Sequence, residues 1–154
     1  MITEQLFQNS VLITTLAAWA ISCILKGGIY FALNRTLPLN RIFGSGGMPS
    51  SHSATVVSMA ASVGLAEGFG SSVFAVSLVL AFVVMYDAAG VRRAAGQHAF
   101  QINAIMDMLA EPDSEARINK LKEILGHTPA EVGAGALLGL IVAAIAYYGG
   151  FFGI

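Results

Sequence analysis

The sequence is poor in charge and in cysteine. Only 11% of its 154 residues are charged and 56% are hydrophobic, whereas a soluble domain carries about 25% charged residues. This composition excludes an ordinary soluble protein and predicts an all-α integral membrane protein with one domain over residues 1–154. The single cysteine, Cys23, excludes an intrachain disulfide. The net charge of −1 is uninformative about nucleic acid. We expect the lipid bilayer as a partner because of the hydrophobic composition, and we expect no nucleic acid.

Long apolar segments with at most one charged residue are what the chain has in abundance. Four of them are about long enough to cross the ~30 Å hydrocarbon core of a membrane as helices. We place these four transmembrane spans at about residues 5–25, 49–66, 72–88 and 130–150. A helical insert at about residues 94–126, with one or two short helices, separates the third span from the fourth.

The insert is the only part of the chain that looks soluble. Residues 97–109 have the spacing of an amphipathic helix. Its candidate apolar-face residues are Phe100, Ile105, Met106 and Leu109. Asp113 or Ser114, after Pro112, is suited to cap a second short helix. We expect that second helix to continue to Leu125.

Small residues recur at helical spacing in two of the spans. Ala54, Ser58 and Ser62 are four residues apart, and Gly135 and Gly139 form a GxxxG pattern. Faces of this kind let helices approach closely in lipid. They predict a tightly packed helical bundle.

All eight lysine and arginine residues fall on one side of a four-span arrangement. The positive-inside rule places that side in the cytoplasm and both termini outside. We therefore expect a multi-pass protein of the cell membrane. The three histidines, His52, His98 and His127, lie on the same side, so a candidate site there would face the cytoplasm.

A glycine turn leads into the second span. Gly46 and Gly47 allow a close backbone approach, and Ser50 or Ser51 is suited to cap the helix that contains His52. Hydroxyls, an imidazole and free helix N–H groups at one point suit an anion. A capped helix start without a ligand explains the same residues, and both interpretations stay open.

Two further clusters carry charge on the same side. Asp87 is followed by Arg92 and Arg93, either as part of a site or as a salt bridge that only fixes the loop. Residues 128–131 read Thr-Pro-Ala-Glu, a helix capping box. Glu131 also stands four residues after His127, where a carboxylate could orient the imidazole, so its role has two interpretations.

These clusters together resemble a known family. Pro49-Ser50-Ser51-His52, His127-x-x-x-Glu131, Lys26 and Arg35 are similar to the motifs of the type-2 phosphatidic acid phosphatase superfamily. The blocks around residues 46–54, 87–93 and 125–132 look more like its divergent branch of small membrane proteins. The superfamily pattern is K-x6-R-P, P-S-G-H and S-R-x5-H-x3-D. The resemblance covers residues 26 to about 139.

The resemblance implies a role for each matching residue. His127 would be the nucleophile, His52 the general acid and Glu131 the carboxylate that orients the nucleophile. The implied phosphate-binding residues are Lys26, Arg35, Ser50, Ser51, Arg92 and Arg93. Asp87, His98 and Gly47 would support them. No metal and no cofactor is implied, and the three histidines have no metal-ligand spacing.

Several positions depart from the superfamily pattern. Leu33 stands where the superfamily has arginine, and Ser51 replaces a glycine. Arg92 lies six residues before His98, which makes His98 an alternative nucleophile, but Ile102 occupies the position of its acid. The branch is two spans shorter than the usual six-helix core, which suggests a homodimer that completes the bundle.

Two classes of function follow from the resemblance. The first is a membrane-embedded phosphatase that hydrolyses an amphiphilic lipid phosphate or pyrophosphate through a phosphohistidine. The second is a catalytically silent protein that binds or transports phosphate, another anion or a lipid head group. The departures from the pattern favour the second, and the co-location of the histidines favours the first.

Overall fold

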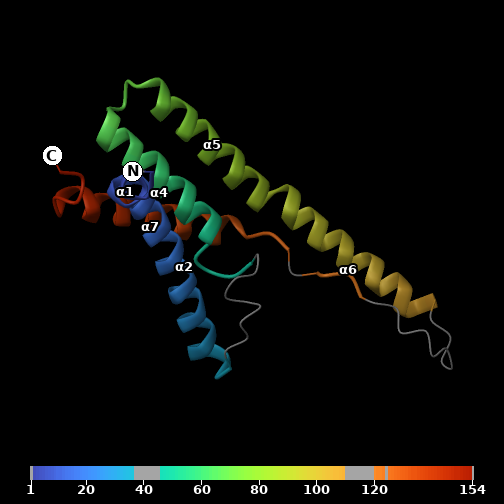
Figure 1. Cartoon of the computed structure of the whole chain (residues 1–154). Helices are drawn as coiled ribbons and strands as arrows, with labels where there is room; N and C mark the ends of the chain where they lie inside the picture. Colours follow the sequence, from blue (N-terminus) through green and yellow to red (C-terminus); the bar gives the residue numbers. More distant parts are fainter. Residues whose placement is uncertain (1, 37–45, 110–119, 124, 154) are drawn as a thin grey trace.

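The computed structural model describes residues 2–36, 46–109, 120–123 and 125–153, and within these residues all regular structure is helical (Figure 1). The all-α prediction is therefore confirmed. The helices, with the labels of Figure 1, are α1 (Ile2–Gln8), α2 (Ser10–Asn34), α4 (Ser51–Glu67), α5 (Ser72–Ala89), α6 (Val91–Leu109) and α7 (Pro129–Tyr148).

Three helical segments are long and apolar enough to cross a membrane: α2, the nearly continuous α5 and α6, and α7. The first span differs from the prediction, because α2 begins at Ser10 and continues through Gly27 and Gly28 to Asn34. Helix α4 has 17 residues and lies among the longer helices. A fourth crossing by α4 stays a prediction.

Capping side chains start the helices where the sequence indicates. Ser50 is the N-cap of α4, and its Oγ accepts a hydrogen bond from the Ser53 N–H. The capping box before α7 is present, with Thr128 and Glu131 each bonding the backbone of the other. Such caps satisfy N–H groups that have no partner within the helix. The two cap predictions are thus confirmed.

Helix α4 is the centre of the bundle and packs on α2, α5 and α7. Its small residues Ala54, Ser58 and Ser62 are buried. A Cβ on Gly139 of α7 would lie 2.5 Å from the carbonyl oxygen of Ala54, and one on Gly135 would overlap the carbonyl oxygen of Ser50. The predicted small-residue faces therefore pack against each other, backbone against backbone.

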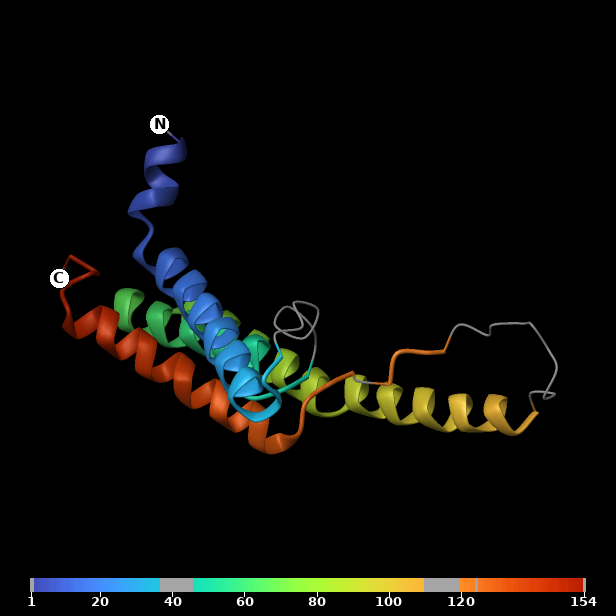
Figure 2. The same ribbon diagram turned by 90° about the horizontal axis from the view of Figure 1, so that it is seen from below.

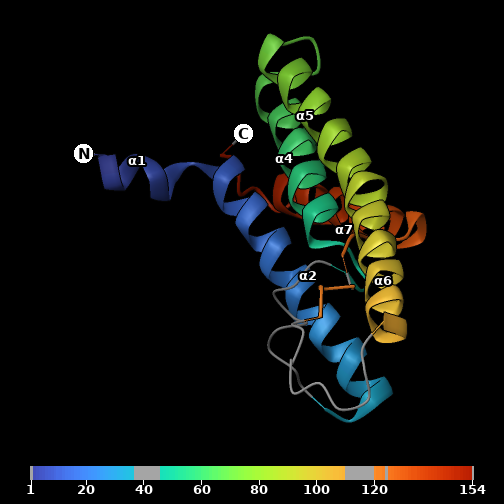
Figure 3. The same ribbon diagram turned by 90° about the vertical axis from the view of Figure 1, so that its right-hand side faces the viewer.

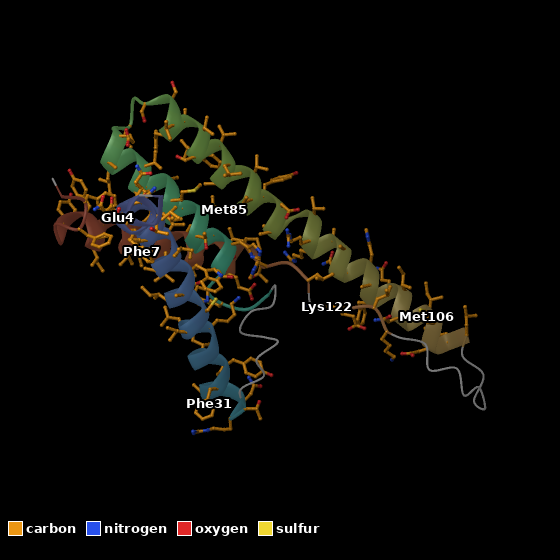
Figure 4. All side chains as sticks on the ribbon, in the orientation of Figure 1. Glu4, Phe7, Phe31, Met85, Met106 and Lys122 are labelled. Carbon is orange, nitrogen blue, oxygen red and sulfur yellow. The ribbon has the colours of Figure 1, made fainter. Side chains whose placement is uncertain are left out.

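Helix α6 continues α5 after Gly90 and leaves the bundle as an arm (Figures 1 and 2). It begins at Val91, six residues before the predicted start at residue 97. Residues 120–123 and 125–127, which we call the return segment, run back along this arm (Figure 1). Met106 and Lys122 in Figure 4 mark the arm and the return segment.

The predicted second helix of the insert is wrong in its last part. Residues 120–123 of the return segment are not helical, although we expected a helix there as far as Leu125. The backbone of these residues is held by α6 rather than by its own helical turns, as shown below. The expected caps Asp113 and Ser114 lie outside the described residues, as do Arg41 and Arg117.

We predict that Gly139→Ala lowers the melting temperature of the purified protein, with a loss of about 1–3 kcal/mol, because the new Cβ would overlap the α4 backbone. Gly133→Ala is the matched control on the same helix, since nothing lies within 4 Å of a Cβ there. Thermal unfolding in detergent measures both. Equal melting temperatures for the two variants would contradict the close contact between α4 and α7.

Candidate functional site

The candidate site lies in the bundle of α2, α4, α5 and α7 (Figure 3). It comprises the starts of α4 and α7, the end of α5 and Lys26 of α2, whose charge acts on His52 and His127. Two backbone hydrogen bonds hold these ends together. The His127 N–H donates to the carbonyl of Ala88 at 2.9 Å, and the Ser50 N–H donates to the carbonyl of Glu131 at 3.0 Å. Segments that are far apart in sequence are thereby fixed around one point.

His127 is almost completely buried, with 1% of its surface exposed. Its Nδ1 lies 3.2 Å from Oε2 of Glu131. The same Oε2 atom accepts the Thr128 N–H at 3.0 Å. The capping role and the orienting geometry of Glu131, which the sequence left as alternatives, are therefore both present in one carboxylate oxygen.

This contact sets the chemical state of the His127 ring. A carboxylate accepts hydrogen bonds, so Nδ1 carries the proton and Nε2 holds the lone pair when the ring is neutral. Nε2 is buried and has no hydrogen-bond partner among the described residues. Burial lowers the pKa of His127, although the hydrogen bond to Glu131 and a backbone group of Gly47 oppose the shift. The neutral ring with a free Nε2 is favoured, which is the form a nucleophile needs.

His52 lies in the first turn of α4 and faces His127. The two ring centroids are 5.7 Å apart, and the ring planes are inclined by 66°. Nδ1 of His52 is buried and, within the described chain, has no hydrogen-bond partner. One phosphate group beside the pair would be within reach of both rings. Two buried ring nitrogens at this spacing could both bond one polar group placed beside them.

Lys26 supplies a buried positive charge next to the histidines. Only 4% of its surface is exposed, and its charge acts on Glu131, His52 and His127. Gly47 packs on its stem, since a Cβ there would lie 3.5 Å from Cγ and Cδ of Lys26. With φ at +87°, Gly47 also has a conformation that favours glycine.

Asp87 and Arg92 form an ion pair at 2.5 Å on the solvent side of the site. Both side chains are partly exposed, so the pair contributes little to stability. Their charges act on the His52 ring. The predicted partner of Asp87 is thus found, and the pair is placed so that Arg92 can also meet an anion beside His52.

Three predicted site residues stand apart from this cluster. Arg35 is exposed at the C-cap of α2, about 14 Å along the helix axis from Lys26. Arg93 is exposed and lines a hollow with Gln97 on α6. His98 is exposed farther along the same arm. Ser51, by contrast, is buried at the start of α4, beside the cluster.

Sequence reasoning missed the residues that hold the return segment in place. Asn103 Nδ2 donates to the carbonyl of Leu121 at 2.9 Å, and its Oδ1 accepts the Leu121 N–H at 2.9 Å. Nδ2 also donates to Glu123 at 2.8 Å. Gly96 and Gly126 let the two backbones approach closely. A lone asparagine in an amphipathic helix gave no sequence signal for this role.

We predict that Asn103→Ala speeds amide hydrogen exchange in residues 120–127, because the Leu121 N–H loses its only described acceptor. A protection loss of about tenfold corresponds to one lost hydrogen bond of ~1.4 kcal/mol. Gln101→Ala is the control on the same helix, since no described hydrogen bond involves its side chain. Unchanged exchange in Asn103→Ala would show that this clamp does not hold the return segment.

The comparisons with known proteins cover nearly the whole chain. A family model described as the divergent PAP2 family matches residues 7–142. The uncharacterized membrane protein YuiD of Bacillus subtilis (strain 168) is 38% identical over 155 residues, which cover 94% of this chain and 98% of YuiD. No solved structure matches the chain. The matched residues include the whole cluster from Lys26 to Glu131.

Proposed function

The chain belongs to the divergent PAP2 family, and on that premise we propose that it is a membrane-embedded phosphatase. It would hydrolyse a lipid phosphate or pyrophosphate through a phosphohistidine. The observation that carries the proposal is the buried pair of His52 and His127, with Glu131 on Nδ1 and nothing described on Nε2 of His127.

The first step is attack on phosphorus. The Nε2 lone pair of His127 forms an N–P bond while the bond from phosphorus to the leaving oxygen breaks, and His52 donates a proton to that oxygen. Glu131 stabilises the positive charge that develops on the His127 ring. His127 is preferred to His98 as nucleophile because His127 contacts a carboxylate and faces His52.

The second step restores the enzyme. Neutral His52 takes a proton from water as the water oxygen attacks the phosphohistidine. The N–P bond breaks, inorganic phosphate leaves, and His127 is neutral again. Each step conserves charge and protons without a metal or cofactor.

We assign phosphate binding to Lys26, Arg92 and the start of α4 at Ser50 and Ser51. A helix N-terminus and nearby cations stabilise the negative phosphate oxygens. Ser50 Oγ bonds the Ser53 backbone and hydroxyl, so its contribution is to hold the N-terminus in shape. Arg35 and Arg93 are left out of this assignment because their side chains lie elsewhere.

Two observations support an amphiphilic substrate. The site lies at helix ends, where a charged head group would meet it at the membrane surface. An apolar groove of about 580 Å³ lies between α4, α5 and α7, with Val57, Leu78 and Leu140 in its walls. Val57 is about 7 Å along the α4 axis from His52. A lipid tail would occupy this groove while the phosphate head group, on the cytoplasmic side, reaches the histidines.

We predict that purified protein releases phosphate from a panel containing phosphatidate and isoprenoid pyrophosphates, and that His127→Gln lowers kcat by about 10³-fold or more. Gln keeps a polar group at this buried position, so loss of folding is tested separately by the melting temperature. His98→Gln is the matched control and is expected to keep kcat within a few-fold of the wild type, because His98 lies outside the cluster.

Two results would contradict the phosphatase. Vanadate that raises the melting temperature without any phosphate release from the panel would favour the silent binding or transport protein. Loss of turnover in His98→Gln, with turnover kept in His127→Gln, would move the nucleophile to α6.

A further inference from the structure

Helix α6 carries an apolar stripe that no described helix covers. We call it the α6 seam, and its residues are Val91, Ala95, His98, Ile102, Ile105 and Leu109. All six are exposed, among them Ile105 at 54% and Leu109 at 77%. The steps between them are four, three, four, three and four residues. This alternation is the heptad spacing of a two-stranded coiled coil.

The seam continues a helix interface that already exists in the bundle. In α5, which packs on α4, the buried residues are Ser77, Ala81 and Ala88. Ala88 stands three residues before Val91, so the seam follows in the same register. Helix α4 covers this stripe in α5 but does not contact α6. The seam therefore continues the α5 face that packs on α4, but beyond the point where α4 is present to cover it.

The rest of the described chain leaves the seam open. Among the helices, α6 contacts only α5. The return segment is bound to another face of α6, through Gly96, Asn103 and Asp107. At 100° per residue, these three residues lie on a different face of α6 from the seam residues. The return segment therefore does not cover the seam.

The direction of α6 argues against the membrane surface as the occupant. The 38 residues from Ser72 to Leu109 are about 57 Å long as a helix, compared with a ~30 Å hydrocarbon core. α6 continues along nearly the same line as α5 and does not turn aside (Figures 1 and 2). A helix that lies on a membrane needs to run in its plane. If α5 crosses the bilayer, α6 projects away from it.

We propose that the α6 seam binds the α6 seam of a second copy of this chain, as a parallel pair of helices outside the bilayer. Two copies inserted in the same direction are related by a two-fold axis along the membrane normal, which brings identical residues to the same height. A heptad seam is self-complementary in that arrangement. Each His98 then faces its counterpart and forms a polar layer that fixes the register.

This proposal does not depend on the phosphatase. The sequence suggests a homodimer that completes the bundle. The proposal places the dimer interface on the α6 arm instead, away from the bundle. The arm also carries the return segment that ends at His127. Pairing two arms would hold the two return segments in place from outside the membrane.

Disulfide cross-linking in native membranes tests the pairing cleanly, because the chain has one cysteine, Cys23, which is buried. In a Cys23→Ala background, Ile102→Cys is expected to give a covalent dimer on oxidation, as is Leu109→Cys. Gln97→Cys, exposed on α6 but outside the seam, is the matched control and is expected to stay monomeric.

A dimer yield for Ile102→Cys at least tenfold above that for Gln97→Cys would support the proposal. Equal yields, or no dimer from either seam variant, would overturn it. The same variants are labelled with a water-soluble maleimide without oxidation. Shielding of Ile102→Cys without cross-linking would assign the seam to lipid or to another protein, and would also overturn the pairing.

Discussion

The site depends on one oxygen atom, Oε2 of Glu131. It caps α7 through the Thr128 N–H and holds the ring of His127 through Nδ1. Because a helix start is rigid, the imidazole gains a fixed orientation. The carbonyl of the same residue accepts the Ser50 N–H, so the start of α4, with His52, is placed by Glu131 as well. Loss of the carboxylate would therefore disturb both the cap and the tautomer of His127, whereas the contact with α4 rests on the backbone of residue 131.

Small residues make this convergence possible. Gly135 and Gly139 bring α7 onto the backbone of α4, so the first turns of both helices lie side by side. Lys26 reaches the same point because α2 also packs on α4, and Gly47 leaves room for its stem. A buried ammonium beside two neutral rings is costly without a counter-charge. Glu131 supplies part of that charge, and a phosphate would supply more.

Local patterns in the sequence were sufficient to predict the local structure. The capping box at Thr128, the Ser50 cap and the small-residue faces depend on neighbours within a few residues or on one helix face, and all are present. The chain path after α6 was not predictable in this way. Asn103 meets Leu121 across 18 residues, and no periodicity encodes such a contact.

The positions of the lysine and arginine side chains around the site could not be predicted from local sequence patterns either. Arg35 and Lys26 are close in sequence, but a continuous α2 separates them by two and a half turns of helix. The sequence predicts that the first span ends near residue 25, and only the folded chain shows that α2 continues through Gly27 and Gly28. Arg92 and Arg93 are adjacent but lie about 100° apart around α6, so Arg92 pairs with Asp87 whereas Arg93 lines the hollow beside Gln97.

Quenching turnover of a lipid substrate with a labelled phosphoryl group in denaturant at alkaline pH, where a phosphohistidine is stable, tests the central claim most directly. Peptide mapping of the trapped protein should locate the label on His127, and His127→Gln should carry none. A label on His98 would contradict the account of His127 as the nucleophile. So would wild-type protein that turns over the substrate but carries no label on any histidine.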